Sequence, residues 1–374
     1  MKKIYLDNAA TTKLDDQVFD AMVPYLKDEF GNPSSIHSFG RKTRAAIETA
    51  RKSVAKLLNV TPAEIFFTSG GTEADNMAIV QTIASHKITH AISSRIEHHA
   101  VEHTLQVLEK EGKIKLSWVN IDGKGNVDLS HLETLLQNNE RSFVSLMHAN
   151  NEIGTLLPIE KVGDLCKKHN AIFHSDTVQT MGHYAMDLKA MNVHLVTCAA
   201  HKFHGPKGVG FLYINHELKI NPFIHGGAQE RNMRGGTENV SGIIGLAKAL
   251  ELCNAEMSAH QQQIQELKTY MRNQVQQQLP GTTFNGEDDD NSLYTVLNCC
   301  FPKSDKGEML LFNLDIHGIA ASGGSACSSG SNQGSHVLRG IAADMERPSV
   351  RFSFSKYNTK EEIDFVIGKL KELL

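Results

Sequence analysis

Short apolar runs alternate with longer amphipathic segments over the first two thirds of the chain. Helical spacing of apolar residues predicts helices over about residues 15–28, 38–58, 71–84, 100–111, 129–137 and 159–169. Apolar runs predict strands over about residues 64–67, 88–92, 115–120, 143–147, 171–174, 194–198 and 209–214. Pro24 lies inside the first helix and is expected to kink or split it. Strands and helices that alternate in this way predict a mostly parallel sheet with helices on both faces.

The pattern changes beyond residue 243. One long helical stretch is expected over about residues 243–278, as a bridge between two domains. The rest of the chain predicts strands near residues 294–301 and 350–355, and helices near residues 306–315, 335–342 and 359–373. This order is typical of a smaller α+β domain, which we expect the first residues of the chain to complete. We therefore expect a large α/β domain at residues 15–255 and a small domain made of residues 1–14 and 256–374.

The composition narrows the class of protein. Of the 374 residues, 40% are hydrophobic and 21% are charged, as in ordinary globular proteins, and the formal net charge is −4. The charge argues against nucleic-acid binding by the protein itself, and no apolar run approaches the ~18 residues of a membrane span. The 6 cysteines form no C-x-x-C pair and the 19 histidines show no H-E-x-x-H spacing, so no metal site is predicted. We expect a soluble cytoplasmic enzyme with reduced thiols.

Polar residues recur where the predicted strands end. They are Thr72, His98, Asn151, Asp176, Gln179, His201 and Lys202. Ligands of parallel sheets bind at the carboxyl ends of the strands, so these side chains are expected to share one site. The Ser-Gly-Gly-Thr turn at residues 69–72 precedes a predicted helix, whose free N–H groups and dipole suit an anion. A plain tight turn would have the same composition.

Lys202 lies in a glycine-rich turn between two apolar runs. It is either a solvated lysine or an amine that forms a Schiff base with an aldehyde cofactor, which in amino-acid chemistry means pyridoxal 5'-phosphate. This cofactor needs an anion cradle, which residues 69–72 offer, and a carboxylate beside its pyridine nitrogen, which Asp176 offers. His98 could stack on the ring, and Gln179 could donate to its phenolic oxygen. Each residue alone could be a core histidine, a helix cap or a surface glutamine, but together they favour the cofactor.

Cys327 lies in a run of small residues, at positions 321–334, that is rich in glycine and serine. Free cysteine is usually buried, so a cysteine in such a loop calls for a reason. One reason is a thiolate nucleophile that is delivered to a substrate or a partner. The alternative is an incidental exposed thiol. We expect the other five cysteines to be structural.

Several motifs occur together from one end of the chain to the other. They include Tyr5 to Thr12, Asn32 to His37, Thr68 to Glu73, Glu97-His98, Asn150 to Gly154, His201-Lys202, Arg234 to Thr237 and Gly324 to Cys327. In this combination the chain resembles the cysteine desulfurases of the NifS/IscS type, within the class V aminotransferase-like enzymes that use pyridoxal phosphate. The combination is far more specific than any single motif.

The resemblance implies a fold and an activity. The fold is the pyridoxal phosphate-dependent transferase fold (aspartate aminotransferase-like, fold type I), with a mostly parallel seven-stranded sheet in a large cofactor-binding domain and a smaller α+β domain that carries the cysteine loop. The implied activity converts L-cysteine to L-alanine and leaves sulfur as a persulfide on Cys327, for delivery to iron–sulfur cluster or thiocofactor assembly. The implied partners are a second copy of the chain, in a homodimer, and a sulfur-acceptor protein such as an iron–sulfur scaffold. The alternatives are a selenocysteine lyase, a class V aminotransferase or a catalytically silent binding protein.

The resemblance also implies a role for each site residue. Lys202 would carry the cofactor and move the Cα proton, while His98 would stack on the ring and assist proton transfer. The other cofactor contacts would be Gly71, Thr72, Asn151, Asp176, Gln179, His201 and, from the neighbouring subunit, Thr237. Arg351 would bind the substrate carboxylate, with Asn151 beside it. Cys327 would be the nucleophile that accepts sulfur.

Two features depart from the family pattern. The family often has a serine three residues before the Schiff-base lysine as a phosphate ligand, and here Ala199 stands at that position. The missing hydrogen bond would cost about 1–3 kcal/mol if nothing replaces it. The chain also stops at Leu374, whereas longer relatives continue into a tail that docks the iron–sulfur scaffold protein.

Overall fold

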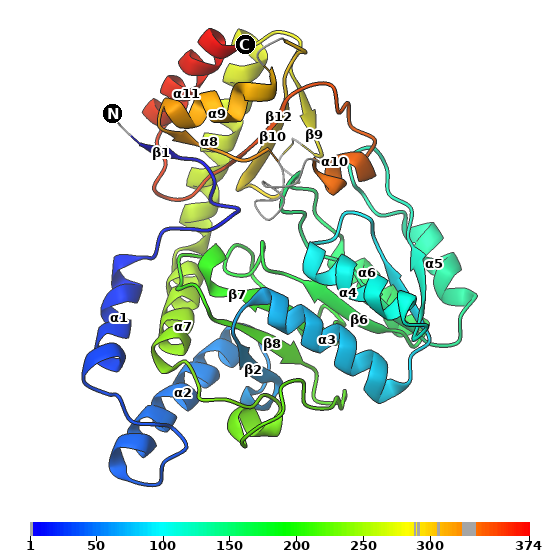
Figure 1. Ribbon diagram of the computed structural model, residues 1–374, viewed down its shortest axis with the longest axis vertical. Helices are drawn as coiled ribbons and strands as arrows, with labels where there is room; N and C mark the ends of the chain where they lie inside the picture. The colour runs from blue at the N-terminus through cyan, green and yellow to red at the C-terminus, as the bar shows by residue number, and fades with distance from the viewer. Residues whose placement is uncertain (1–2, 288, 290–291, 305–306, 324–333) are drawn as a thin grey trace.

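The structure is a computed structural model that describes residues 3–287, 289, 292–304, 307–323 and 334–374 (Figure 1). Its centre is a seven-stranded sheet in the order β2-β8-β7-β6-β5-β3-β4. These strands are β2 (Ile65–Thr68), β3 (His90–Ser93), β4 (Lys115–Trp118), β5 (Ser142–Ser145), β6 (Ile172–Asp176), β7 (Leu195–Ala199) and β8 (Gly210–Ile214). Only β8 runs antiparallel to its neighbours in this sheet. The predicted mostly parallel, seven-stranded sheet is confirmed.

Helices cover both faces of this sheet. They are α1 (Asp16–Lys27), α2 (Ser38–Leu57), α3 (Gly71–His86), α4 (His99–Lys110), α5 (Leu129–Gln137), α6 (Ile159–Lys168) and α7 (Val240–Ala255). Successive residues of a strand point to opposite faces. Accordingly Phe143 of β5 packs in the cluster that contains Met77 of α3, whereas Val144 packs in the cluster that contains Val54 of α2 and Leu246 of α7.

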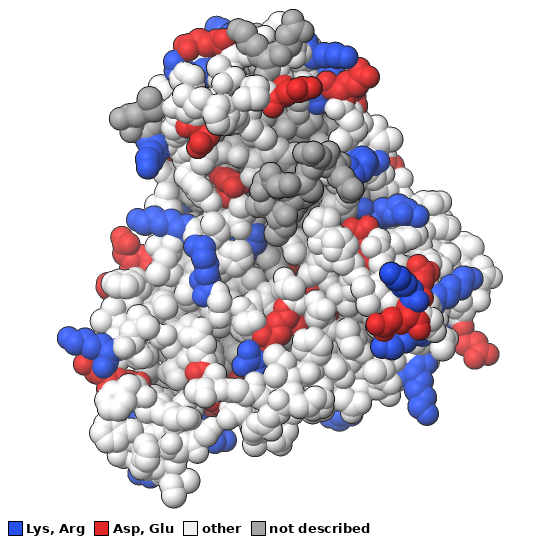
Figure 2. Space-filling view, viewed as in Figure 1, with Lys and Arg blue, Asp and Glu red and all other residues white. Residues whose placement is uncertain are grey.

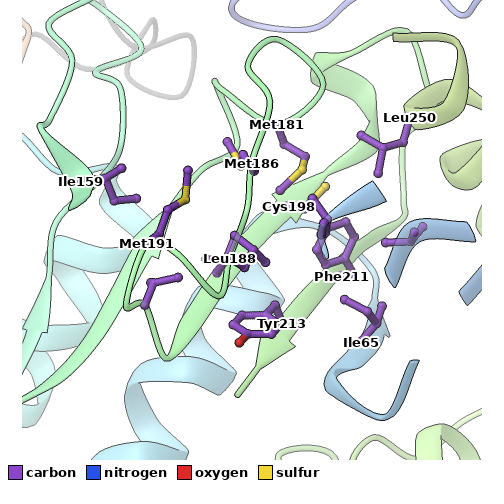
Figure 3. Close-up of a cluster of buried hydrophobic side chains, with 14 of the residues drawn as sticks. Ile65, Ile159, Met181, Met186, Leu188, Met191, Cys198, Phe211, Tyr213 and Leu250 are labelled. Carbon is purple, nitrogen blue, oxygen red and sulfur yellow. The ribbon is translucent and has the colours of Figure 1, made fainter. Parts of the chain in front are cut away.

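Figure 3 shows part of the core on the α7 side of the sheet. Phe211 and Tyr213 of β8 lie there with Cys198 of β7 and Leu250 of α7. The thiol of Cys198 is thus a core group. Cys166, Cys253, Cys299 and Cys300 are also buried, as expected for structural thiols.

The prediction of one continuous helix over residues 243–278 is wrong. The structure has two helices, α7 and α8 (Met257–Gln278), which are separated at Glu256. Pro24, in contrast, does not split α1, because its carbonyl oxygen still accepts from the N–H groups of Asp28 and Glu29 in the final turn. No helix in the described part of the chain is long and apolar enough to cross a membrane.

A second, smaller unit lies at the top of Figure 1. Its antiparallel sheet has β10 (Val296–Cys300) between β9 (Thr283–Asn285) and β12 (Ser349–Ser353), and β1 (Ile4–Tyr5) pairs in parallel with β11 (Ile319–Ala320). The helices are α8, α9 (Leu310–Ile316), α10 (His336–Gly340) and α11 (Lys360–Leu373). Ile4 and Leu6 share a core with residues of α8 and α11. The two- and three-residue strands β1, β9 and β11 are too short for sequence periodicity to predict.

Candidate active site

A cavity of about 200 Å³ lies at the carboxyl edge of the large sheet. It is lined by Ala9, Ala10, Gly71, Thr72, Asp75, His98, Met147, Asn151, Asp176, Val178, Gln179, Ala199, His201, Lys202 and Arg351. The chain brings these residues from the ends of β6 and β7, the beginnings of α3 and α4, the N-terminal segment and β12. Every predicted site residue in the described part of the chain therefore lines the cavity, except Thr237.

Lys202 ends a short 3-10 turn, Ala200–Lys202, that directly follows β7. Its Nζ donates to the carbonyl oxygens of Ala9 and Ala10, at 2.5 and 3.0 Å. The side chain of Gln179 donates to the same Ala9 oxygen at 3.0 Å. The N-terminal segment thus lies directly against the amine, and its carbonyls hold that amine inside the cavity.

The turn that carries Lys202 is fixed by its backbone. The carbonyl oxygen of His201 accepts from both the backbone N–H and the hydroxyl of Thr12, at 2.9 and 3.0 Å. A Cβ at Gly205 would lie 2.8 Å from the Ala200 side chain, so only glycine lets the chain pass there. Burial lowers the pKa of His201 to about 4, and its neutral ring contacts the hydroxyl of Thr11.

Asp176 ends β6 at the floor of the cavity. Its Oδ1 accepts from the backbone N–H of Val178 at 2.8 Å. Burial raises the pKa of Asp176 to about 6, although that N–H and the charge of Lys202 act in the opposite direction. A backbone hydrogen bond therefore orients the carboxyl of Asp176.

Asp75, on α3, was missed from the sequence. It is 1% exposed, and its Oδ1 has no hydrogen-bond partner among the described residues, the nearest histidine nitrogen being that of His174 at 3.5 Å. Burial, followed by the charge of Asp176, raises the pKa of Asp75 well above its usual range. Two buried carboxyls so close together do not both ionise, so Asp75 keeps its proton when Asp176 is charged.

His98 caps the N-terminus of α4. Its Nδ1 accepts from the backbone N–H of Ala100 at 3.2 Å. Burial, followed by the charge of Lys202, lowers the pKa of His98 to about 4. A neutral imidazole therefore enters the cavity, with a ring nitrogen within 4.8 Å of carboxyl oxygens of Asp75 and Asp176.

The first turn of α3 forms the anion cradle that the sequence predicted. Gly70 caps the helix with a φ of +151° and without a side-chain hydrogen bond, which leaves backbone N–H groups for a ligand. A Cβ at Gly71 would lie 3.0 Å from the Val178 side chain and 3.7 Å from that of Ala199. Ala199 thus lies at the cradle itself, and Thr72 is the residue beside it that offers a hydroxyl.

Arg351, on β12, is 1% exposed and closes the cavity from the small unit. Its guanidinium donates to the carbonyl oxygen of Asn151 at 2.9 Å and to Oδ1 of Asp7 at 2.7 Å. Its Nε has no partner among the described residues. Two bonds therefore orient the guanidinium, and one buried donor is left for a ligand.

One predicted residue in the described part of the chain, Thr237, does not line the cavity. Thr237 lines a separate pocket with Ser69 and Arg234, and Arg234 is fixed by an ion pair with Glu73 at 2.9 Å. Cys327 lies outside the described residues. Thr237 was predicted to act on a neighbouring subunit, so its position away from its own cavity leaves that prediction open.

Comparisons with known proteins agree with this architecture. The family described as aminotransferase class-V matches residues 4–366. A curated relative from Dictyoglomus turgidum, named cysteine desulfurase IscS, is 45% identical over 100% of this chain and 95% of its own length. The chain belongs to the cysteine desulfurases of the class V aminotransferase family. A second such desulfurase, from Clostridium botulinum strain Hall, is 43% identical over 100% of this chain and 94% of its own length.

Solved structures of this family share the fold. A structure titled NifS-like protein superimposes with a TM-score of 0.91 at 36% identity and covers 99% of both chains. Another, from Rickettsia africae, has a TM-score of 0.89 at 31% identity and covers 100% of this chain and 99% of that one. The predicted fold type I architecture is thereby confirmed.

The cavity fits the cofactor of this desulfurase family, pyridoxal phosphate. The cofactor requires an amine, a carboxyl for the ring nitrogen and donors for a phosphate dianion. Lys202, Asp176 and the uncapped first turn of α3 meet these needs within a single cavity. The missing side chain at Gly71 keeps the phosphate end open, where a Cβ would close on Val178.

Proposed function

We propose that the protein converts L-cysteine to L-alanine with pyridoxal phosphate as cofactor and passes the sulfur to Cys327 as a persulfide. One observation carries the proposal. Lys202, the buried Asp176 and the buried Arg351 line a single cavity in a chain of the cysteine desulfurase family.

Pyridoxal phosphate, when bound, supplies an electron sink that makes the Cα proton of an attached amino acid acidic. Lys202 would hold the cofactor and would remove and return the Cα proton of the substrate. Asp176 would remain ionised beside the protonated ring nitrogen, because that cation would offset the burial that otherwise raises the pKa of the carboxyl.

The remaining cavity residues position the reacting groups. His98 would stack its flat neutral ring on the cofactor ring, and its imidazole nitrogen could accept a proton. Gln179 and Asn151 contact the ring substituents, while Gly71, Thr72 and His201 bind the phosphate. Arg351 would bind the substrate carboxylate with the N–H groups of its guanidinium. Its Nε has no hydrogen-bond partner among the described residues, and the N–H group that donates to Asp7 could be released or shared, because a guanidinium has several donors.

The sulfur step balances without an external oxidant. The Cys327 thiolate attacks the sulfur atom of bound cysteine, so an S–S bond forms while the C–S bond breaks. The electron pair of the broken bond stays with the substrate carbon, which takes up a proton and leaves as the methyl group of alanine. Cysteine and the enzyme thiol thus give alanine and the enzyme persulfide.

A homodimer is part of this proposal. The turn between α1 and α2 and the beginning of α2 expose large apolar side chains, among them Phe30, Ile36 and Phe39, and Ile36 is 90% exposed. Figure 2 shows few charged side chains on the lobe that α1 and α2 form at the lower left. An apolar patch of this kind suits a second copy of the chain. Thr237 of the partner subunit would then reach the phosphate end of this cavity.

Three further predictions belong with this function. We propose that residues 15–255 form the cofactor-binding domain and that residues 1–14 and 256–374 form the small domain that carries Cys327. The common core of Ile4 and Leu6 with α8 and α11 supports this division. The sulfur would go to an acceptor protein such as an iron–sulfur scaffold. The cytoplasmic location stays a prediction.

The test incubates the purified holoenzyme with L-cysteine and measures alanine and sulfide, with and without a thiol reductant. The proposal expects one alanine per sulfur transferred, with turnover that needs the reductant, and expects Cys327→Ser to stop turnover. Alanine formed at an undiminished rate by Cys327→Ser would favour a lyase that releases sulfur without this thiol. Selenocysteine as the preferred substrate would favour the selenocysteine lyase, and activity only with a keto acid would favour the aminotransferase.

A further inference from the structure

A group of metal-binding side chains lies beside the cavity but does not line it. His99 and Glu102 occupy the first turn of α4, and His336 begins α10. The Oε2 atom of Glu102 lies 3.6 Å from Nδ1 of His99 and 3.8 Å from Nε2 of His336. One possible ligand atom from each residue falls within 4.8 Å of those of the other two. Two elements that are distant in sequence thus converge on one point.

The group also has unused ligand capacity. Nδ1 of His99 is buried and has no hydrogen-bond partner among the described residues. Glu102 receives a hydrogen bond from Gln106 at 3.1 Å on Oε1, so Oε2 is the oxygen that faces the imidazoles. A buried nitrogen without a partner costs stability unless a ligand completes it.

The spacing suits a small divalent ion. Zinc binds histidine nitrogens and carboxylate oxygens at about 2.0–2.2 Å, which sets neighbouring ligand atoms roughly 3.3 Å apart in a tetrahedron. The observed 3.6 and 3.8 Å need only small side-chain rotations to reach that separation. The three side chains are 25%, 13% and 15% exposed, which leaves room for water as a fourth ligand.

We propose that His99, Glu102 and His336 form a binding site for a divalent transition-metal ion of the zinc type, completed by water. His103 stacks on the ring of His99 at 4.5 Å and supports its orientation. In the structure, Nε2 of His336 donates a hydrogen bond to the carbonyl oxygen of Glu97 at 2.8 Å. An ion bound at Nε2 would replace the proton of this hydrogen bond.

The position of the site gives the ion a mechanical effect. It joins α4, whose N-cap His98 lies in the cavity, to α10, which follows the Cys327 segment in sequence. Binding of the ion would therefore fasten α10 to the first turn of α4, next to His98 at the cavity.

The test titrates Zn²⁺ into the metal-stripped holoenzyme by isothermal calorimetry, in a Cys327→Ser background that removes a competing thiol. We expect one ion per chain. Glu102→Gln and His336→Ala should each weaken binding by more than about 100-fold, because each removes a ligand and secondary contacts alone cost about 10–100-fold. His260→Ala is the matched control, since His260 of α8 pairs with Glu256 at 3.0 Å but belongs to no metal-binding group among the described residues, and it should bind like the parent.

Glu102→Gln keeps the shape of the side chain, so it tests the site even if His336→Ala fails to fold. Co²⁺ in place of Zn²⁺ should give visible absorption bands of a tetrahedral nitrogen–oxygen site in the parent and not in Glu102→Gln. No binding of Zn²⁺ at micromolar concentration would overturn the proposal. Binding of equal strength in the parent and in Glu102→Gln would also overturn it.

Discussion

Buried charged side chains have more hydrogen-bond partners in the scaffold, meaning the helices and strands away from the cavity, than in the cavity itself. Arg51 of α2, in the scaffold, donates to both carboxylate oxygens of Glu230, at 2.7 and 2.9 Å, and also to Glu48 and the carbonyl oxygen of Ile65. Arg351, in the cavity, is as deeply buried, but its Nε has no partner among the residues that the structure describes. The first guanidinium is fully used by the fold, whereas the second is oriented by the fold and left partly free.

The carboxyl groups repeat this contrast. Both oxygens of Glu230 accept from Arg51, and one also accepts from the backbone N–H of Phe67 at 2.8 Å. Asp176 accepts one backbone N–H, and Oδ1 of Asp75 accepts none. Buried polar groups are usually satisfied, so groups left incomplete in one cavity indicate a ligand. The contrast therefore separates residues that stabilise the fold from residues that bind.

Arg51→Leu should give the largest change in stability. It leaves Glu230 as an unpaired buried charge, which costs about 3–5 kcal/mol of unfolding free energy. Denaturant unfolding of the holoenzyme would measure the loss, while kcat/KM of the remaining folded protein should stay near the parent value. Adding Glu230→Gln removes the stranded charge and should recover part of the stability. A fully stable Arg51→Leu protein would contradict the inference that Arg51 serves mainly to stabilise the fold.

Arg351→Gln should act mainly on the reaction. Hydrogen bonds to charged groups contribute about 1.5–3 kcal/mol each, so losing two of them to the substrate carboxylate should lower kcat/KM by about 100-fold or more. Steady-state kinetics with L-cysteine would show the loss, and thermal unfolding should change less than in Arg51→Leu. A variant with normal kinetics would show that Arg351 belongs with the scaffold.

Asp176 should make the stability of the cofactor-free protein depend on pH. Its pKa is raised to about 6 in the folded state, so the folded protein binds a proton that the unfolded chain has already lost. The stability present near pH 4 is therefore lost as the pH rises through 6, by on the order of 2–3 kcal/mol relative to Asp176→Asn. The pyridinium of the holoenzyme should abolish this difference. Denaturant unfolding from pH 4 to 7 would measure it, and a difference of the opposite sign would contradict the account.

Asp75→Asn should have the smallest effect. The amide resembles the protonated acid that we infer at this position, so kcat/KM should change by less than about 5-fold. Asp75→Leu, which removes the polar atoms, should change it more. If Asp75→Asn were as impaired as Asp176→Asn, an ionised Asp75 would be required and the inferred proton would be wrong.

Much of this molecule could be predicted from local patterns. The sheet followed from alternating apolar runs, and Asp176 and Lys202 were found because they end strands. Asp75 gave no such signal, because an acidic residue near the beginning of a helix is ordinary at the surface. The pairing of Arg51 with Glu230 joins positions 179 residues apart, which no periodicity encodes. Glu230 and Arg231 also have φ values of +44° and +57°, which their residue types do not predict.

The most direct test of the account is the attachment site of the cofactor. The yellow holoenzyme is reduced with borohydride, digested and analysed by mass spectrometry. The account predicts that the reduced pyridoxyl phosphate group is found on the peptide that contains Lys202, and that Asp176→Asn carries it at the same lysine with altered absorption. A label on another lysine, or no label on a protein saturated with pyridoxal phosphate, would contradict it.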